Sequence, residues 1–177
     1  TWDENSGGDL REYDGFAWYR CTLRLPGNWE KGNDVELFVP KVDNAHEAYF
    51  NGVKIGGAGK FPPAYESGLA QENTYKIPES AKHRGKDNII AIRVFDHDGR
   101  GGFKSVAPLL KKGDQAINLD GRWEFRLGDD VKWAKGPIEV TAAAEYWRVF
   151  SWEEALANAA GTDPPLPPAE AIKTFTV

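Results

Sequence analysis

The stretch DNAHEAYFNGVKIGG, residues 43–57, decides the fold of this chain. Two short runs that alternate apolar and polar residues, 47–50 and 53–55, flank the dipeptide Asn51-Gly52. Asn-Gly between alternating runs is the strongest short signal for a β-hairpin. Polar residues precede the first run, so the open end of this hairpin faces either water or a ligand. The stretch therefore predicts an antiparallel hairpin and poses the question of what its polar end does.

Outside the hairpin, short alternating or apolar segments bounded by turn residues predict further strands. The segment 88–95, NIIAIRVF, is apolar on both faces at its start and predicts a central strand. Seven Trp, nine Phe and six Tyr occur with 19 Gly and 11 Pro, a mixture that favours short strands and turns over a helical bundle. The sequence therefore predicts an all-β fold. The other predicted strands are 17–25, 34–39, 74–77, 105–110, 116–119 and 123–127.

The C-terminal part of the chain differs from the rest. We expect a β-sandwich domain over 1–150, with its core at 10–127. Ser151-Trp152-Glu153-Glu154 matches a capping box and predicts a short helix over 151–160. Residues 161–177 begin GTDPPLPP, a run typical of an extended linker. Because the chain has no Met at its start and no signal peptide, we expect it to be part of a longer protein, whose next module follows this linker.

Charge and hydropathy exclude several classes of partner. The net charge of −5 and the pI of about 5.3 leave no basic surface for nucleic acid. No apolar run approaches the roughly 18 residues that a membrane span needs. Cys21 is the single cysteine, so no disulfide forms within the chain, and its strand-like surroundings predict a buried, inert thiol.

Tight turns between the strands indicate which loops share an end of the sandwich. If successive strands reverse direction, and if the loop after residue 57 returns locally, four segments meet at one end. Function concentrates on loops that a rigid scaffold holds. This end has aromatic, Asp, Asn, His and Arg residues, whereas the other end has mainly Lys, Glu, Asn and Gly. The four segments are 13–16, 43–46, 59–68 and 96–100.

Such an end suits carbohydrate. Aromatic rings offer a flat apolar surface to the C–H face of a sugar, and they cost little rotamer entropy to hold in place. Charged and amide groups bind hydroxyls, with charge assistance for Arg and Asp. The candidate stacking residues are Tyr13, Phe61, Tyr65 and Phe103, and the candidate hydrogen-bonding residues are Asp43, Asn44, His46, Asp96, Asp98 and Arg100.

Other chemistry has less support in the sequence. Asp96-His97-Asp98-Gly99 offers carboxylates to a structural Ca²⁺ ion, but it lacks the spacing and the distal Glu of a calcium loop, and Asp96 equally suits a loop-anchoring role. Zinc would need more ligands than His46 and His97. No GxSxG motif provides a hydrolase nucleophile. Asp14, Asp43 and Asp96 could converge as a carboxylate pair for glycoside cleavage, but we expect no enzyme and no cofactor.

Four stretches resemble the galactose-binding-like jelly-roll domains that accompany sialate O-acetylesterases and family 2 glycoside hydrolases. They are YDGFAWYRCTLRLP (13–26), VDNAHEAYFNGVKIGGAGKFPP (42–63), NIIAIRVFD (88–96) and GRGGF (99–103). INLDGRWEFRLGDD (117–130) is similar to the segment that follows the jelly roll in the esterase group. PLPPAEAIKTFTV (165–177) is similar to the lead-in of large dehydrogenase-like and haem-binding proteins of planctomycete-type bacteria.

The resemblance implies a jelly-roll β-sandwich with an exposed ligand rim and no catalysis of its own. We therefore expect a monomeric carbohydrate-binding module of a secreted bacterial protein, extracellular or periplasmic, that binds a plant or algal polysaccharide. The alternative is a structural accessory domain that packs on a catalytic hydrolase or redox domain of the same parent chain. In that case the same aromatic residues form an interface between domains.

Overall fold

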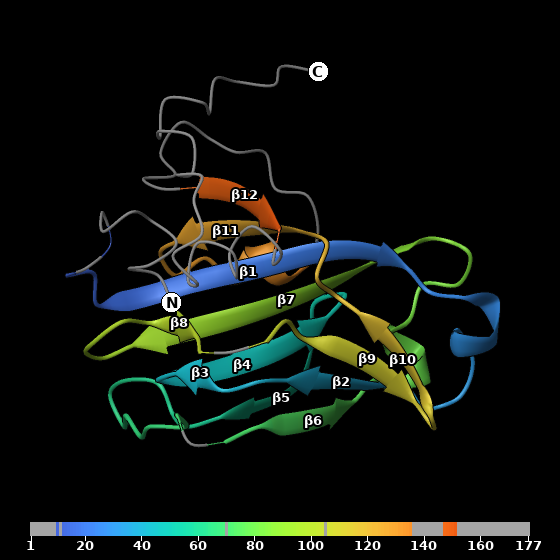
Figure 1. Cartoon of the computed structure of the whole chain (residues 1–177), viewed down its shortest axis with the longest axis horizontal. Helices are drawn as coiled ribbons and strands as arrows, with labels where there is room; N and C mark the ends of the chain where they lie inside the picture. The colour runs from blue at the N-terminus through green and yellow to red at the C-terminus, as the bar shows by residue number, and fades with distance from the viewer. Residues whose placement is uncertain (1–9, 11, 70, 105, 136–146, 152–177) are drawn as a thin grey trace, which may run out of the picture.

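The computed structural model of the chain describes residues 10, 12–69, 71–104, 106–135 and 147–151. These residues form a jelly-roll β-sandwich of antiparallel sheets with three short 3₁₀-helices, so the predicted fold class is confirmed (Figure 1). None of the helices in this described part of the chain is long and apolar enough to cross a membrane. The 3₁₀-helices are η1 (Gly27–Trp29), η2 (Glu79–Ala81) and η3 (Val131–Ala134).

Two sheets face each other across the core, and a two-stranded ribbon lies beside them. The larger sheet has the order β12 (Trp147–Ser151), β11 (Arg122–Leu127), β1 (Gly15–Arg24), β7 (Asp87–Asp96), β4 (Ala45–Phe50), β5 (Val53–Ala58). The smaller sheet has the order β10 (Gln115–Asn118), β9 (Leu109–Lys112), β2 (Glu36–Val39), β6 (Asn73–Lys76). The ribbon pairs β3 (Val42–Asp43) with β8 (Gly102–Phe103).

The predicted hairpin and the predicted central strand are both confirmed. Asn51 and Gly52 connect β4 to β5 with φ angles of +47° and +79°, the left-handed conformation that this turn requires. β7 pairs with β1 along its whole length and with β4 on its other side, so it lies within the sheet. Its apolar start is buried because other strands cover it on both edges and the core covers its inner face.

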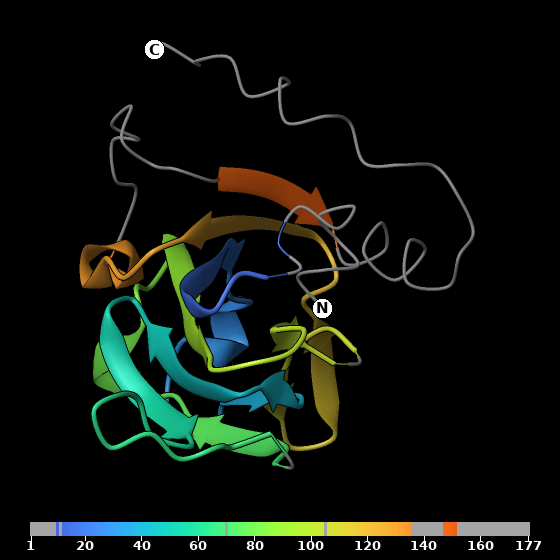
Figure 2. The same ribbon diagram turned by 90° about the vertical axis from the view of Figure 1, so that its left-hand side faces the viewer.

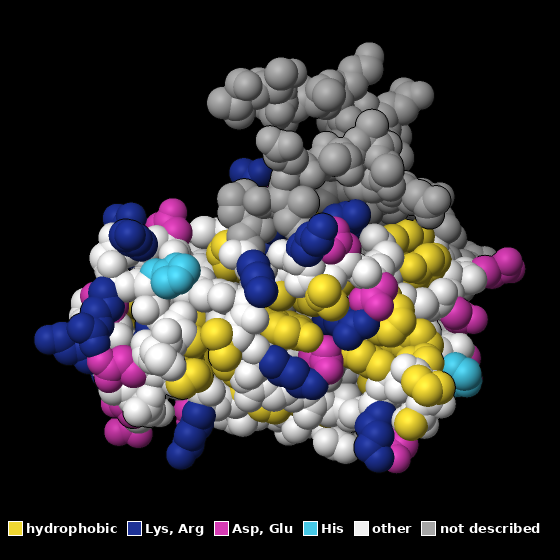
Figure 3. Space-filling view, turned by 180° about the vertical axis from the view of Figure 1, so that it is seen from behind, with side chains coloured by type: hydrophobic (Ala, Val, Ile, Leu, Met, Phe, Trp, Pro, Cys, Tyr) yellow, Lys and Arg dark blue, Asp and Glu magenta, His cyan; other side chains and the backbone are white. Residues whose placement is uncertain are grey.

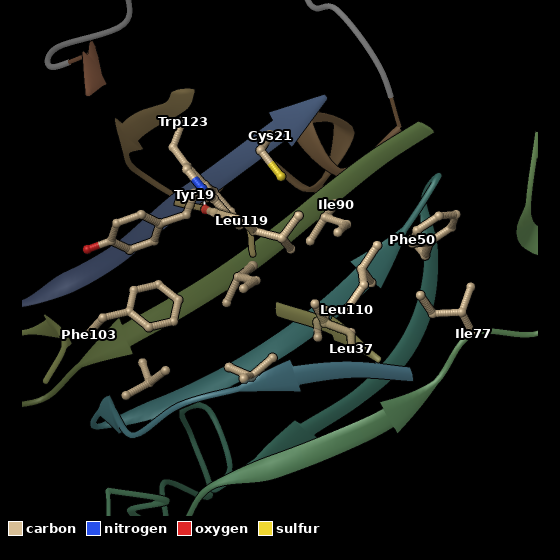
Figure 4. Packing of buried hydrophobic residues seen from close by; sticks show 14 of the residues in the cluster. Tyr19, Cys21, Leu37, Phe50, Ile77, Ile90, Phe103, Leu110, Leu119 and Trp123 are labelled. Atoms are coloured by element: carbon tan, nitrogen blue, oxygen red, sulfur yellow. Dashed lines mark hydrogen bonds between the residues drawn. The ribbon is translucent and has the colours of Figure 1, made fainter. Parts of the chain in front are cut away.

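The core fills the space between the sheets because strand residues alternate inward and outward. In β1, Ala17, Tyr19 and Cys21 point inward and pack against side chains of the opposite sheet such as Leu37 and Leu110 (Figure 4). Burial raises the pKa of the Cys21 thiol, which agrees with the predicted inert role.

A second, smaller cluster lies on the outer face of the larger sheet. Trp18 and Ala91 are covered there by Trp133 and Ala134 of η3. Arg20 completes the cover, because its guanidinium lies 4.3 Å from the Trp133 ring centroid and pairs with Glu124. η3 therefore covers only part of this face.

Two predicted bounds differ from the structure. Segment 105–110 is no single strand, since β8 precedes it and β9 begins only at Leu109. β12 joins the larger sheet outside the predicted core of 10–127, and Ser151 is its last residue. The remaining helix residues and the 161–177 linker lie outside the described residues.

Candidate functional site

Four segments meet at one end of the sandwich, as the chain reversals predict. Gly15 pairs with Asp96, Ala45 with Phe95, and His46 with Ala58, so β1 and β4 begin where β7 and β5 end. Loop 59–68 returns to the same end, where the Gly68 N–H donates to the Asn44 carbonyl oxygen at 2.7 Å. We call this end the rim; Figure 2 looks onto it.

Asn44 and Asp43 form the framework of the rim. The Asn44 Oδ1 atom accepts the His97 N–H at 2.7 Å, and its Nδ2 atom donates to Asp43 Oδ1 at 2.7 Å. Asp43 Oδ2 pairs with Lys104 Nζ at 2.6 Å. Both side chains are buried. The structure therefore buries both of these predicted ligand-binding residues, and their polar atoms hold three segments of the rim together.

His46 and Phe103 lie in the core instead of the exposed rim. His46 points between the sheets, where its Nε2 atom lies 3.0 Å from the Tyr75 hydroxyl. Burial lowers its pKa to about 4, so the ring is neutral at physiological pH. The Phe103 ring packs edge-on against Tyr19 with centroids 4.9 Å apart. Neither ring can reach a ligand at the surface.

Asp96 is the unusual carboxyl group of the rim. It is 0% exposed, and neither of its side-chain oxygens makes a hydrogen bond of good geometry. Burial raises its pKa to about 7, and the negative charges of Asp43, Asp14 and Asp98 add to this, whereas the Asp98 backbone N–H acts weakly in the opposite direction. Asp96 therefore cannot touch a surface ligand or reach a glycosidic bond.

The structure pairs some of the rim carboxylates that the sequence offered to a calcium ion. Ca²⁺ takes six to eight oxygen ligands. Asp96 has two oxygens to offer, but those of Asp43 are used by Lys104 and Asn44. Within the described residues, no group of three or more His, Cys, Asp or Glu side chains is arranged to hold a metal ion.

A chain of rings lies on the outer face of the larger sheet, next to the rim. We call Phe16, Phe61, Tyr65, Phe95 and His97 the aromatic patch. Tyr65 lies over His97 with centroids 4.4 Å apart, Phe16 meets Phe61 edge-on at 5.2 Å, and Phe95 contacts Phe16 at 4.8 Å and Tyr65 at 5.8 Å. Figure 3 shows this face, where hydrophobic side chains gather toward the right. His97 is exposed and the other four rings are half-buried.

Arg93 fixes the inner side of the patch. Its guanidinium carbon lies 4.4 Å from the Phe16 centroid and 4.6 Å from the Phe61 centroid. Nε and Nη2 donate to the two Asp129 carboxylate oxygens at 2.7 and 2.6 Å, and Nη1 donates to Glu47 at 3.2 Å. Burial disfavours the charged guanidinium, but the bonds to Asp129 and Glu47 outweigh it and raise the pKa of Arg93.

The ten predicted ligand residues therefore divide by burial. Five are buried in the framework or the core, and five lie at the surface of the rim. Tyr13 is half-buried, with its hydroxyl donating to the Phe16 carbonyl oxygen at 2.9 Å. Sequence reasoning did not assign Phe16, Phe95, His97 or Arg93 to the site. The five predicted residues at the surface are Tyr13, Phe61, Tyr65, Asp98 and Arg100.

Solved structures of similar fold include enzymes and a lectin that act on or bind sugars. An α-L-rhamnosidase of Streptomyces avermitilis, complexed with L-rhamnose, matches 78% of this chain with 15% identity and a TM-score of 0.56. A lectin of Pleurotus ostreatus in complex with GalNAc matches 74% with 17% identity and a TM-score of 0.50.

The chain spans 13% of the rhamnosidase and 35% of the lectin. A β-glucuronidase of glycoside hydrolase family 2 matches 49% of the chain and 8% of its own length, with 26% identity and a TM-score of 0.39. No protein-family model and no curated protein sequence matches the chain. The likeness to the rhamnosidase and the lectin establishes the β-sandwich fold.

Proposed function

We propose that this chain is a non-catalytic carbohydrate-binding module and that its ligand rests on the aromatic patch at the rim. The single observation that carries the proposal is the exposed edge of the patch, where Tyr65 and His97 stack beside loops that supply Asp98 and Arg100. Rings that pack on one another at a surface, next to polar groups, form a platform for the apolar face of a sugar.

The absence of catalysis is part of the proposal and rests on the carboxylates. Glycoside cleavage needs two carboxyl groups that flank the scissile bond. Asp96 is fully buried and Asp43 is paired with Lys104, so among the three predicted acids only Asp14 is exposed. We also propose that the module acts outside the cytoplasm, attached to other domains of its parent protein, because polysaccharides are found there.

The test is affinity electrophoresis of the chain in gels that contain single plant and algal polysaccharides, followed by calorimetric titration with matching oligosaccharides. One shallow site of this kind should bind with a Kd between about 1 mM and 1 µM. Tyr65→Ala should weaken binding about tenfold or more, because it removes a stacking ring that also supports His97.

Phe38→Ala is the matched control. Phe38 is also half-buried on an outer face, under the Lys111 ammonium, but it belongs to the smaller sheet. We expect this variant to retain the full affinity. Equal affinity of Tyr65→Ala and the unmodified chain would remove the patch from the proposed site, provided that thermal melting shows both variants to be folded.

A second candidate function is an accessory domain that docks on a catalytic neighbour. The half-buried rings of the aromatic patch favour it too, since aromatic side chains are enriched at protein interfaces. The small share of the rhamnosidase that the chain spans agrees with a domain inside a larger enzyme. The two candidates differ in the gel experiment, because a docking domain should bind none of the polysaccharides.

A further inference from the structure

The charge of the aromatic patch is already balanced within the protein. Arg93 is the cation in contact with the rings, and its Nε, Nη1 and Nη2 atoms all donate to protein carboxylates. The fork between Nε and Nη2, which would otherwise grip a carboxylate of a ligand, is filled by Asp129 in bidentate geometry. An acidic ligand would have to displace Asp129 before it could use this cation.

Among the described residues, the loops around the patch carry no excess of positive over negative side chains. Lys60 is paired with Glu66 in loop 59–68. Arg100 shares its loop with Asp98, and both are exposed. Asp14 is exposed at the start of β1 and adds negative charge to the same end. The formal charges of the described residues around the patch therefore balance or leave an excess of negative charge, which disfavours an anion.

We infer that the aromatic patch takes an uncharged sugar and discriminates against uronic acids and sulfated sugars, with Asp129 as the specificity-determining residue. This inference rests on the proposed function. Asp129 holds the guanidinium between Phe16 and Phe61 and cancels its charge, so Arg93 supplies a flat, neutral wall to the site. Asp129 is a positioning residue, because it acts on the ligand through Arg93.

The test compares polysaccharides that share a backbone sugar and differ in charge. Three matched pairs serve: galactan and polygalacturonan, glucan and glucuronan, mannan and polymannuronate. Affinity gels and calorimetry at about 10 mM ionic strength, where exposed charges act over roughly 30 Å, give the largest effect. For any pair that binds, we expect the neutral member to bind at least about fivefold more tightly, and the ratio to shrink in 1 M salt.

Asp129→Asn tests the assigned residue directly. This substitution removes the negative charge that Asp129 places beside Arg93. The affinity for the carboxylated member should then rise about threefold or more at low salt, while the affinity for the neutral member stays within about twofold. Asp87→Asn is the control, because it removes the same charge from an exposed ion pair with Arg24 at the opposite end of β7, away from the patch. It should change neither affinity.

Each outcome separates this inference from the proposed function. Tighter binding of the carboxylated member by the unmodified chain would overturn the inference and leave carbohydrate binding intact. An unchanged ratio in Asp129→Asn would overturn the role of Asp129. If no polysaccharide of either charge bound, the proposed function itself would fail, and the inference would fail with it.

Discussion

The two ends of β7 each bury a polar side chain completely, but they satisfy it in opposite ways. At the end away from the rim, Asn88 is 0% exposed and uses its whole amide: Oδ1 accepts from the His83 N–H and from Asn51 Nδ2, and Nδ2 donates to the His83 and Lys86 carbonyl oxygens. At the rim, Asp96 is equally buried, and its oxygens make no hydrogen bond of good geometry.

The neighbours of these two residues repeat the contrast. Away from the rim, Lys82 Nζ donates to the Trp29 and Gly32 carbonyl oxygens, and Asn51 Oδ1 accepts the Ile89 N–H, so loops are tied by hydrogen bonds. The rim surface instead consists of rings in contact with one another. The rim loops are also tied, by Asn44 and Asp43, but only the rim leaves a buried carboxyl group without a well-formed hydrogen bond and carries the aromatic patch that we propose for a ligand.

The largest effect should come from Asn88→Ala. Four partner groups lose their hydrogen bonds, so we expect the free energy of unfolding to fall by about 3–4 kcal/mol. Urea denaturation measures this, and Asn118→Ala in β10, where the side chain is exposed, should change it by less than about 0.5 kcal/mol. A loss below about 1 kcal/mol for Asn88→Ala would break the comparison.

Asp96→Asn should have the opposite sign at the other end of the strand. The pKa of Asp96 is raised from 3.8 to about 7, so the folded state holds a proton that the unfolded state releases, and stability falls as the pH rises from about 4 to 7. At pH 8 the variant should be about 2–3 kcal/mol more stable than the unmodified chain, and near pH 4 about equal to it.

Urea denaturation across this pH range checks the prediction, with Asp114→Asn, an exposed carboxylate in the turn between β9 and β10, as the control that should leave the profile unchanged. Destabilisation of Asp96→Asn at pH 8 would mean that the buried carboxylate is satisfied after all. In that case the buried polar side chain would be satisfied by hydrogen bonds at both ends of β7.

The sequence specifies much of the fold through local patterns. Asn51-Gly52 fixes one hairpin, and the apolar start of 88–95 identifies the central strand, because both signals depend only on adjacent residues. Strand 147–151 is not among the strands that the sequence predicts, since its pairing with β11 depends on residues that are distant in the sequence.

The site is less predictable because burial depends on register. The sequence around Asp43 and Asn44 is turn-like and predicts exposed side chains. In the structure both are buried, because their polar atoms bind groups of neighbouring loops. Phe16 and Phe95 lie 79 positions apart by their numbering and become neighbours only through the antiparallel pairing of β1 with β7. The alternation of residues along each strand predicts that each ring faces outward. Only the register between the strands shows that the rings are neighbours.

His46 offers a smaller effect that sharpens the comparison, because it belongs to the core beneath the rim. Its pKa is lowered from 6.5 to about 4, so its contribution to stability is present above pH 6.5 and is lost as the pH falls toward 4. In an Asp96→Asn background, which removes the opposing contribution of Asp96, we expect a loss of about 1.5 kcal/mol between pH 7 and pH 5 that His46→Gln abolishes. The measurement is urea denaturation at both pH values, and an unchanged difference in the variant would contradict the assignment.

The smallest effects should come from exposed ion pairs, and they should be equal at both ends. Lys60 and Glu66 at the rim, and Arg24 and Asp87 at the opposite end, all have side chains more than half exposed. Glu66→Gln and Asp87→Asn should each change the free energy of unfolding by less than about 0.5 kcal/mol in thermal or urea denaturation. If one variant lost clearly more free energy of unfolding than the other, surface ion pairs would contribute to the difference between the two ends.

The burial of Cys21 has a practical consequence for these experiments. Because the single thiol of the chain is enclosed in the core and its pKa is raised, maleimide reagents should not modify the folded protein. A cysteine introduced at exposed Lys86, at the start of β7, would then be the sole reactive position. A dye or a chip linker attached there would lie about 30 Å from the rim, the length of this ten-residue strand, so every immobilised molecule would present its aromatic patch outward to a test ligand in solution.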